Sequence, residues 1–270
     1  MDITLSEYDM DASECELLAK TSQSAALKSL FDALKDLLED VCLEFDHDGA
    51  RLVSPDSTHI AMIHLKLDAS NFEEYSCSQP ISVGININRF SKLLKSVSNS
   101  DTITLFVSSS DTASLGLRVE NAERRTNTIF RISMMDLQSD HIELPPIEFD
   151  SRISLPSSDL QKLIRDMATI SDRVEITNTR DRLTLACAGD FCSQETVLEE
   201  SSKFTSSMQQ DTSIIQGVFS LSYLAIFCKC SSLCPTVELN LKNDYPIIFS
   251  YTVAALGDLK LLLSPMCAPE

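Results

Sequence analysis

Three cysteines near the end of the chain have the type and spacing that could bind zinc or carry out thiol chemistry: Cys228, Cys230 and Cys234. A structural zinc site needs four ligands, and its cysteine pairs are separated by roughly two to four residues. These three residues supply no fourth ligand. Cys228 also continues the helical apolar spacing of Leu224 and Phe227, which is typical of a packed core. The pattern therefore favours core packing over a metal site.

A second candidate for chemistry is the carboxylate–histidine cluster Asp46-His47-Asp48. It lies directly before a glycine, in a turn where aspartate is expected for structural reasons. His59 and His64 lie on opposite faces of one predicted strand, so they would not readily share a metal. The chain has no Gly-x-Ser-x-Gly nucleophile motif, and its six glycines are too dispersed for a phosphate-binding loop. We expect no enzyme activity, catalytic residue, metal or cofactor; a zinc or thiol enzyme is the distant alternative.

Basic side chains form the third pattern, and they recur at helical spacing in four short segments. Bases three or seven residues apart share one face of a helix, away from its apolar stripe. The chain as a whole has a formal net charge of −18, so a positive face is a local exception. Such a face would follow phosphates without reading bases. The eight bases are Lys28, Lys35, Arg89, Lys92, Lys95, Lys162, Arg165 and Lys229, and four acids share their segments, Asp32, Asp36, Asp159 and Asp166.

The elements that must position these bases are four predicted helices. Apolar residues recur at i, i+3, i+4 and i+7 in residues 24–38, 88–98, 158–169 and 220–230. Asn88 is the predicted N-cap of the second helix, and Ser157 or Ser158 that of the third. The intervening chain has the alternating pattern of strands, at 59–67, 81–87, 102–107, 113–119, 128–133, 173–177, 182–187, 236–241 and 246–253.

The spacing of these elements indicates an internal duplication. The first and second helices begin 64 residues apart, and the third and fourth begin 62 residues apart. The chain thus repeats one unit, in which a helix, strands, a second helix and further strands follow one another. This repeat predicts an α+β chain of two similar domains with mostly antiparallel sheets. No apolar run reaches the roughly 18 residues of a membrane span, so no membrane association is expected. The nine cysteines, an odd number, predict free thiols in a reducing compartment.

Several short motifs in this framework resemble those of DNA sliding clamps, most closely the proliferating cell nuclear antigen family. Each motif alone is weak, but their order and spacing between about residues 16 and 267 are specific. The resemblance implies clamp domains at 16–133 and 151–267, a connector at 134–150, and an acidic extension at 1–15 that is expected to be disordered. The motifs are Ala33-Leu34-Lys35-Asp36-Leu37, Asp56-Ser57-Thr58-His59-Ile60, Ser91-Lys92-Leu93-Leu94-Lys95, Met135-Asp136-Leu137, Arg165-Asp166, and Gly257-Asp258-Leu259-Lys260 followed by Ser264-Pro265.

The resemblance implies a DNA polymerase processivity factor. Three identical chains would form a ring, with the helices lining the hole and the sheets forming the outer shell. Seven of the eight bases named above, all except Arg89, fall where the family keeps its inner bases, while Ser29 and Ser222 replace two others. Expected partners are double-stranded DNA, a DNA polymerase, a clamp loader and replication proteins that carry a peptide motif. The expected location is the nucleus, or a viral replication compartment.

The resemblance also implies a hydrophobic pocket under the connector, which receives a short partner helix. The residues themselves favour an extended connector with one buried face, because Ile142 and Leu144 alternate with acids beside two prolines. Pinning of the connector to its own domain would explain this pattern equally well. Pro55 and Leu262 replace a methionine and an aromatic residue of the family. The pocket maps to Pro55, Ile60, Met62, Ile142, Leu144, Pro246, Leu262, Ser264 and Pro265.

A third implied site is the subunit interface, formed by pairing one edge strand from each domain. It maps to residues 127–133 and 187–198 and includes Phe130, Ile132, Cys192 and Thr196. Arg180 stands where the family carries a modifiable lysine, so regulation by lysine modification at that position is expected to be absent. Two related classes remain as alternatives: a subunit of a heterotrimeric checkpoint clamp, and a viral processivity factor that forms no ring.

Overall fold

The computed structural model describes residues 14–137, 147–179, 182–199, 204–208 and 214–266. Contacts between residues divide the chain into two compact units. The first unit consists of Met1–Leu52, Leu65–His141 and Val253–Gly257, and the second of Val53–His64, Ile142–Thr252 and Asp258–Glu270. The division of domains predicted at the connector stays a prediction. Most of the predicted N-terminal extension lies outside the described residues, although its last residue, Cys15, already begins the first strand.

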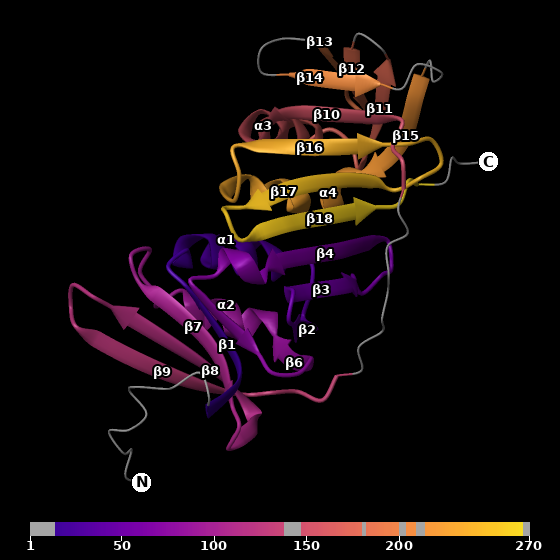
Figure 1. The fold of residues 1–270 in the computed structure, drawn as a ribbon. Helices are drawn as coiled ribbons and strands as arrows, with labels where there is room; N and C mark the ends of the chain where they lie inside the picture. The colour runs from indigo at the N-terminus through magenta and orange to yellow at the C-terminus, as the bar shows by residue number, and fades with distance from the viewer. Residues whose placement is uncertain (1–13, 138–146, 180–181, 200–203, 209–213, 267–270) are drawn as a thin grey trace. The chain divides into compact units, whose positions relative to one another are not determined.

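The first unit contains a five-stranded antiparallel sheet in the order β5-β1-β7-β8-β9 (Figure 1). A second group of strands has β2 between β3 and β6, with antiparallel pairing on both sides. Parts of β3 and β4 belong to this unit and parts to the second one. The bounds are β1 (Cys15–Thr21), β2 (Asp40–Asp46), β3 (Gly49–Pro55), β4 (Ala61–Asp68), η3 (Ala69–Asn71), β5 (Glu74–Cys77), β6 (Ile81–Asn86), β7 (Thr102–Ser108), β8 (Asp111–Asn121) and β9 (Thr126–Ser133).

The second unit contains a four-stranded sheet in the order β13-β12-β11-β15 and a second series of strands in the order β14-β10-β16-β17-β18. The registers of both are antiparallel where they are defined. The bounds are β10 (Ser151–Pro156), β11 (Arg173–Thr179), β12 (Arg182–Ala188), β13 (Ser193–Glu199), β14 (Thr205–Met208), β15 (Ile214–Ser220), β16 (Thr236–Leu241), β17 (Ile247–Val253) and β18 (Gly257–Leu263).

Each unit also holds a pair of helices that pack on one another. In the first unit these are α1 (Ser24–Leu34) and α2 (Ile87–Leu94), and the rings of Phe31 and Phe90 meet edge to face with centroids 4.7 Å apart. In the second unit α3 (Ser157–Met167) packs against α4 (Leu221–Phe227) and the 3-10 helix η4 (Cys228–Ser232). The apolar stripes predicted from sequence are the buried faces, because helix packing removes them from water.

The α+β class with four helices and mostly antiparallel strands is confirmed, and so are the four predicted helix positions. Two capping predictions were wrong. The N-cap of α2 is Asn86, whose side chain accepts a hydrogen bond from the backbone N–H of Arg89 at 3.0 Å, so Asn88 lies inside the first turn. The N-cap of α3 is Pro156, which makes no side-chain cap, and Ser157 is the first helical residue. Both helices begin earlier than the apolar spacing indicated.

Several strands lacked the predicted alternation. β1 is buried along most of its length, with the pattern CELLAKT, and a strand covered on both faces shows no period of two. β2, β5, β10, β14, β15 and β18 were also not predicted as separate strands, although the burial of β2 and β10 does alternate along the strand.

Candidate functional site

The largest group of exposed bases along one helix lies at α2. Arg89, Lys92 and Lys95 are all exposed, and their spacing of three places them on one side of the helix. Residues 86–97 contain no acid. None of the three makes an ion pair with another described residue. This charge is therefore available to a ligand rather than used inside the chain.

The two bases of α1 are held by neighbouring groups. Lys28 is half-buried, and its Nζ donates to the backbone carbonyl of Val97 at 2.5 Å and to Oδ1 of Asn99 at 3.3 Å. Lys35 is also half-buried and pairs with Asp32, three residues earlier. The charge of Lys35 is thus partly neutralised by Asp32, and the ammonium group of Lys28 is held against Val97 and Asn99.

The second helix pair carries less charge. Lys162 and Arg165 are exposed on α3, which also carries Asp159 and Asp166, and Lys229 is exposed on η4. Ser222 is exposed on α4, where the family resemblance implies a base. The structure places all eight predicted bases on the surface or half-buried, and none in a core.

Six of the residues mapped to the partner pocket lie at or near the surface of the second unit, and the backbone N–H of Ser264 donates to the carbonyl of Ile60 at 3.0 Å. Leu262 is only 7% exposed, so it belongs chiefly to the core. Ile142 and Leu144 lie outside the described residues. Pro55, Met62, Pro246 and Pro265 are half-buried, and Ile60 and Ser264 are exposed.

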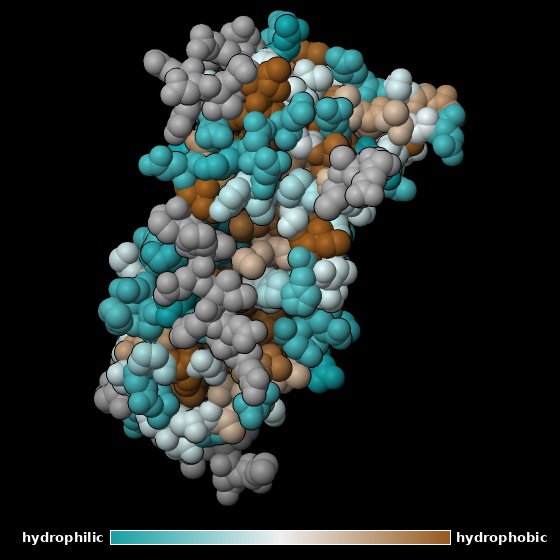
Figure 2. All heavy atoms as spheres, turned by 90° about the vertical axis from the view of Figure 1, so that its right-hand side faces the viewer, coloured by the Kyte–Doolittle hydropathy of each residue, from teal (hydrophilic) through white to brown (hydrophobic). Residues whose placement is uncertain are grey.

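A cavity of about 720 Å³ adjoins these residues and shares Pro265 with them. Three large apolar side chains that are exposed in the second unit line it: Ile214, Tyr245 and Met266. Two acids, Glu175 and Asp244, lie among them. Figure 2 shows hydrophobic side chains exposed in separate patches among hydrophilic ones on the face that it presents. The sequence did not single out this cavity, because its walls come from four separated segments.

The loop at residues 56–61 contains a polar cluster that the sequence did not indicate. Asp56 is 5% exposed, and its carboxylate accepts hydrogen bonds from the backbone N–H groups of Ile60 and Ala61 and from the hydroxyls of Thr58 and Tyr223. Burial raises the pKa of Asp56, but the hydrogen bonds from Thr58, Tyr223 and Ala61 outweigh it and lower the pKa from 3.8 to about 2. The carboxylate is therefore ionised at any ordinary pH.

The predicted interface residues lie on or beside edge strands. β9 ends the five-stranded sheet and β13 ends the four-stranded sheet, so each has one edge that pairs with no other strand among the described residues. Phe130 and Ile132 are half-buried on β9, Thr196 is half-buried on β13, and Cys192 is exposed just before β13. Free edges of this length invite pairing with another chain. Arg180 lies outside the described residues.

Two of the three cysteines near the end of the chain belong to the core, and Cys234 is half-buried. Cys228 and Cys230 are buried, and burial raises the pKa of each thiol to about 12, so both are neutral. Tyr251 is buried as well, and burial raises its pKa well above 10. These side chains pack as core residues of the second unit.

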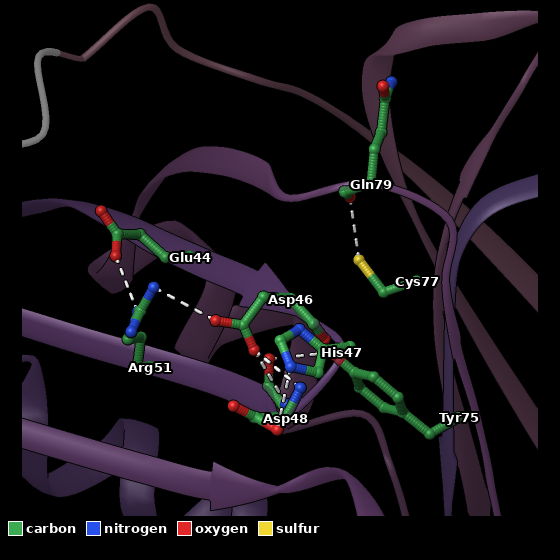
Figure 3. A network of polar contacts seen from close by, with 9 residues as sticks. Glu44, Asp46, His47, Asp48, Arg51, Tyr75, Cys77 and Gln79 are labelled. Atoms are coloured by element: carbon green, nitrogen blue, oxygen red, sulfur yellow. Dashed lines mark hydrogen bonds and ion pairs between the residues drawn. The ribbon is translucent and has the colours of Figure 1, made fainter.

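Figure 3 shows the cluster at Asp46, His47 and Asp48, the one group of three close potential metal ligands in the described parts of the chain. Arg51 bridges Glu44 and Asp46 with contacts of 3.0 and 3.1 Å, and His47 lies 3.3 Å from Asp48. Oδ1 of Asp46 also accepts the backbone N–H groups that close the turn between β2 and β3. The turn and the ion pairs thus give these side chains structural roles.

Comparison with known proteins identifies relatives over almost the whole chain. The model of the N-terminal domain of proliferating cell nuclear antigen matches residues 16–141, and that of its C-terminal domain matches residues 143–266. A protein of Paramecium bursaria Chlorella virus 1 named probable DNA polymerase sliding clamp 1 is 36% identical over 251 residues, which cover 92% of this chain and 95% of the relative. Proliferating cell nuclear antigen of Chaetomium thermophilum is 29% identical over 253 residues, which cover 92% and 97%. No described helix is both long and apolar enough to span a membrane.

Proposed function

Because the chain belongs to the proliferating cell nuclear antigen family of sliding clamps, we propose that it is a DNA polymerase processivity factor that encircles duplex DNA as a homotrimeric ring. The observation that carries this proposal is the exposed row of Arg89, Lys92 and Lys95 along α2 and its C-cap, in a chain of net charge −18. None of the three forms an ion pair with another residue that the structure describes. The ring is inferred from membership of the family. The position of DNA beside the helices is inferred from their positive charge.

The proposed ring needs only weak contacts with DNA. A closed ring cannot leave DNA sideways, so it does not need tight binding, and a few screened contacts to phosphates permit sliding. The DNA-facing residues are Lys28, Lys35, Arg89, Lys92, Lys95, Lys162, Arg165 and Lys229, with α2 contributing most. The acidic remainder of the chain repels DNA from the outer surface. The binding is independent of DNA sequence, because these lysine and arginine side chains contact phosphates and not the edges of the nucleobases.

Ring closure follows from pairing β9 of one copy with β13 of the next, through Phe130, Ile132, Cys192 and Thr196. The two edges have opposite charge: Arg131 is exposed on β9, whereas Glu195 and Glu199 are exposed on β13. Opposite charges across paired strands favour this head-to-tail contact by roughly 0.2–1 kcal/mol each, and pairing of two identical edges would bring like charges together. Head-to-tail contacts close into a ring when the rotation between successive copies adds up to a full turn, and the proposed trimer requires a rotation of this kind.

The alternation of exposed residues supports one register. On β13 the odd-numbered residues are exposed and the even-numbered ones half-buried, and the second half of β9 follows the same rule. If the half-buried Phe130 and Thr196 share one face, Arg131 shares the other face with Glu195 and Glu199. A slip by one residue would reverse this arrangement.

The surface around Ile60, Ser264 and Pro265 is the proposed site for partner proteins. It combines exposed and half-buried apolar residues, as a groove for an amphipathic helix requires. Its proposed residues are Pro55, Ile60, Met62, Ile142, Leu144, Pro246, Leu262, Ser264 and Pro265. The partners are a DNA polymerase, a clamp loader and replication proteins with a short anchor motif. The chain acts without catalysis, metal or cofactor, in the nucleus or in a viral replication compartment.

Two measurements test the proposal. Light scattering of the purified full-length chain is expected to give about 90 kDa, three times the 29.9 kDa chain. A polymerase assay on primed circular DNA is expected to show longer products when the chain and a clamp loader are added. A species of about 30 kDa, or a large species only with other proteins, would refute the homotrimer and favour a non-ring factor or a mixed checkpoint clamp.

A further inference from the structure

The loop between β3 and β4 is built around one carboxylate. Oδ1 of Asp56 accepts the backbone N–H groups of Ile60 at 2.9 Å and Ala61 at 2.8 Å. Oδ2 accepts the backbone N–H of Thr58 at 3.2 Å and its hydroxyl at 2.6 Å. The carboxylate thus accepts four hydrogen bonds from within its own loop.

The loop needs this support because its backbone is strained. His59 has a φ of 58°, in the left-handed region that a residue with a side chain rarely adopts. Such a conformation persists only where the surrounding contacts fix it. The backbone N–H of His59 donates to the carbonyl of Asp56 at 3.0 Å, and residues on either side of His59 donate to the Asp56 carboxylate.

One donor to Asp56 comes from a distant part of the chain. The hydroxyl of Tyr223, on α4, donates to Oδ2 of Asp56 at 2.6 Å and lies 2.7 Å from the hydroxyl of Thr58. The other donors are within five residues of Asp56, whereas Tyr223 is 167 residues away. This contact therefore attaches the loop to a helix rather than shaping it locally. Both residues belong to the second unit.

The loop in turn presents Ile60 to solvent. The side chain of Ile60 is 43% exposed, and its carbonyl accepts the N–H of Ser264 at 3.0 Å. Ile60 and Ser264 are both residues of the proposed partner pocket. Ile60 is thus bonded to the Asp56 carboxylate, and that carboxylate is in turn bonded to Tyr223.

We propose that Tyr223 is a positioning residue for partner binding: through Asp56 it holds the loop at residues 56–61 so that Ile60 forms a preformed apolar wall beside Ser264. This inference rests on the proposed function of the pocket. A wall that is already ordered spares the partner the entropy cost of ordering it on binding. Removal of the hydroxyl would leave the pocket residues unchanged and the loop freer to move.

The ionisation states suit this role. The pKa of Asp56 is lowered to about 2, so its carboxylate accepts all these bonds at physiological pH. Burial and the hydrogen bond to Asp56 raise the pKa of Tyr223 above 10, so its hydroxyl keeps the proton that it donates. The contact is a charge-assisted hydrogen bond, the stronger kind.

The test uses the full-length chain and a synthetic 16-residue labelled peptide with isoleucine, phenylalanine and phenylalanine at helical positions i, i+3 and i+4. Tyr223→Phe removes the hydroxyl and keeps the ring. We expect this variant to bind the peptide about three- to tenfold more weakly, with unchanged oligomeric mass. Hydrogen exchange at the amides of Ile60 and Ala61 is expected to accelerate. Both amides donate to the Asp56 carboxylate, which moves more freely once the hydrogen bond from Tyr223 is lost.

Tyr75→Phe is the matched control. The hydroxyl of Tyr75 also makes two short hydrogen bonds, at 2.6 and 2.8 Å to the carbonyls of Asp46 and Gly49, but in the first unit. A general loss of stability would affect both variants alike, whereas peptide affinity should fall only for Tyr223→Phe. Equal peptide affinity of Tyr223→Phe and the unmodified chain would overturn the inference. Failure of the unmodified chain to bind the peptide would refute the proposed pocket, and this inference with it.

Discussion

α2 and α4 hold the same place in the two halves of the repeated framework, but their exposed residues differ. α2 presents Arg89, Lys92 and Lys95 to solvent, whereas α4 has an exposed serine at 222 and uses Tyr223 to reach Asp56. Both helices keep their buried apolar stripe. The fold constrains the buried face, because a change there leaves a cavity or a clash, and leaves the outer face free to diverge.

The edge strands of the two halves differ in the same way. β9 presents Arg131, and β13 presents Glu195 and Glu199. If both edges were identical, an edge could pair equally well with either edge of another copy. Two complementary edges favour only the head-to-tail pairing of β9 with β13. The two halves thus differ in what they would contribute to the proposed function: the first carries most of the bases proposed to face DNA, and the second carries the residues that support the proposed partner pocket.

The largest effect is expected from making the two edges alike. Glu195→Arg combined with Glu199→Arg places positive charge on both edges, and we expect the mass to fall from about 90 to about 30 kDa in light scattering. Adding Arg131→Glu to the same chain is expected to restore the larger species, because the charges are opposite again. Glu74→Arg on β5, another edge strand, serves as the control. A trimer that survives the double substitution would contradict the proposed role of charge.

Removing the charge of α2 tests the difference between the helices. With Arg89, Lys92 and Lys95 all changed to alanine, affinity for a short duplex at about 0.1 M salt should fall at least about tenfold. The slope of log affinity against log salt should decrease by about 3, close to one unit for each lost phosphate contact. Lys229→Ala, beside α4, should change the slope by about 1 or less. Fluorescence anisotropy over a salt series measures both, and equal effects would contradict the comparison.

Asp56→Asn should destabilise the second half in a pH-dependent way. The folded pKa of about 2 lies below the ordinary 3.8, so the carboxylate stabilises the fold fully above about pH 4 and loses this effect as the pH falls toward 2. The shift corresponds to about 2 kcal/mol at pH 7. Urea unfolding at pH 7, 4 and 3 should show the deficit of the variant shrinking as the pH is lowered. A deficit that stays constant with pH would contradict this account.

The smallest effect concerns the helix starts. Asn86→Ala removes the side-chain cap of α2 and should lower the free energy of unfolding by about 1 kcal/mol. Ser158→Ala, at the start of α3, should change it by less than about 0.5 kcal/mol, because α3 has no side-chain cap. Urea unfolding measures both changes. A loss of about 1 kcal/mol for Ser158→Ala as well would show that the two helix starts do not differ.

Local periodicity was enough to place the four helices and the surface position of the bases. A stripe at i, i+3 and i+4 requires only that one face be buried, so Leu27, Leu30 and Leu34 identify α1 without knowledge of what covers them. The same reasoning failed at Asn88 and Ser157, because a cap depends on where the chain turns into the helix. It also failed at β1, where both faces are covered.

The sequence by itself determined the duplicated framework, the apolar stripes and the concentration of positive charge on helices, because each depends on residues a few positions apart. Only the tertiary structure decided that β9 and β13 are edges, that Lys28 and Lys35 are held by neighbours while the bases of α2 are not, and that Tyr223 reaches Asp56. These features depend on contacts between distant segments. Such contacts form when the whole chain packs, and no local pattern records them.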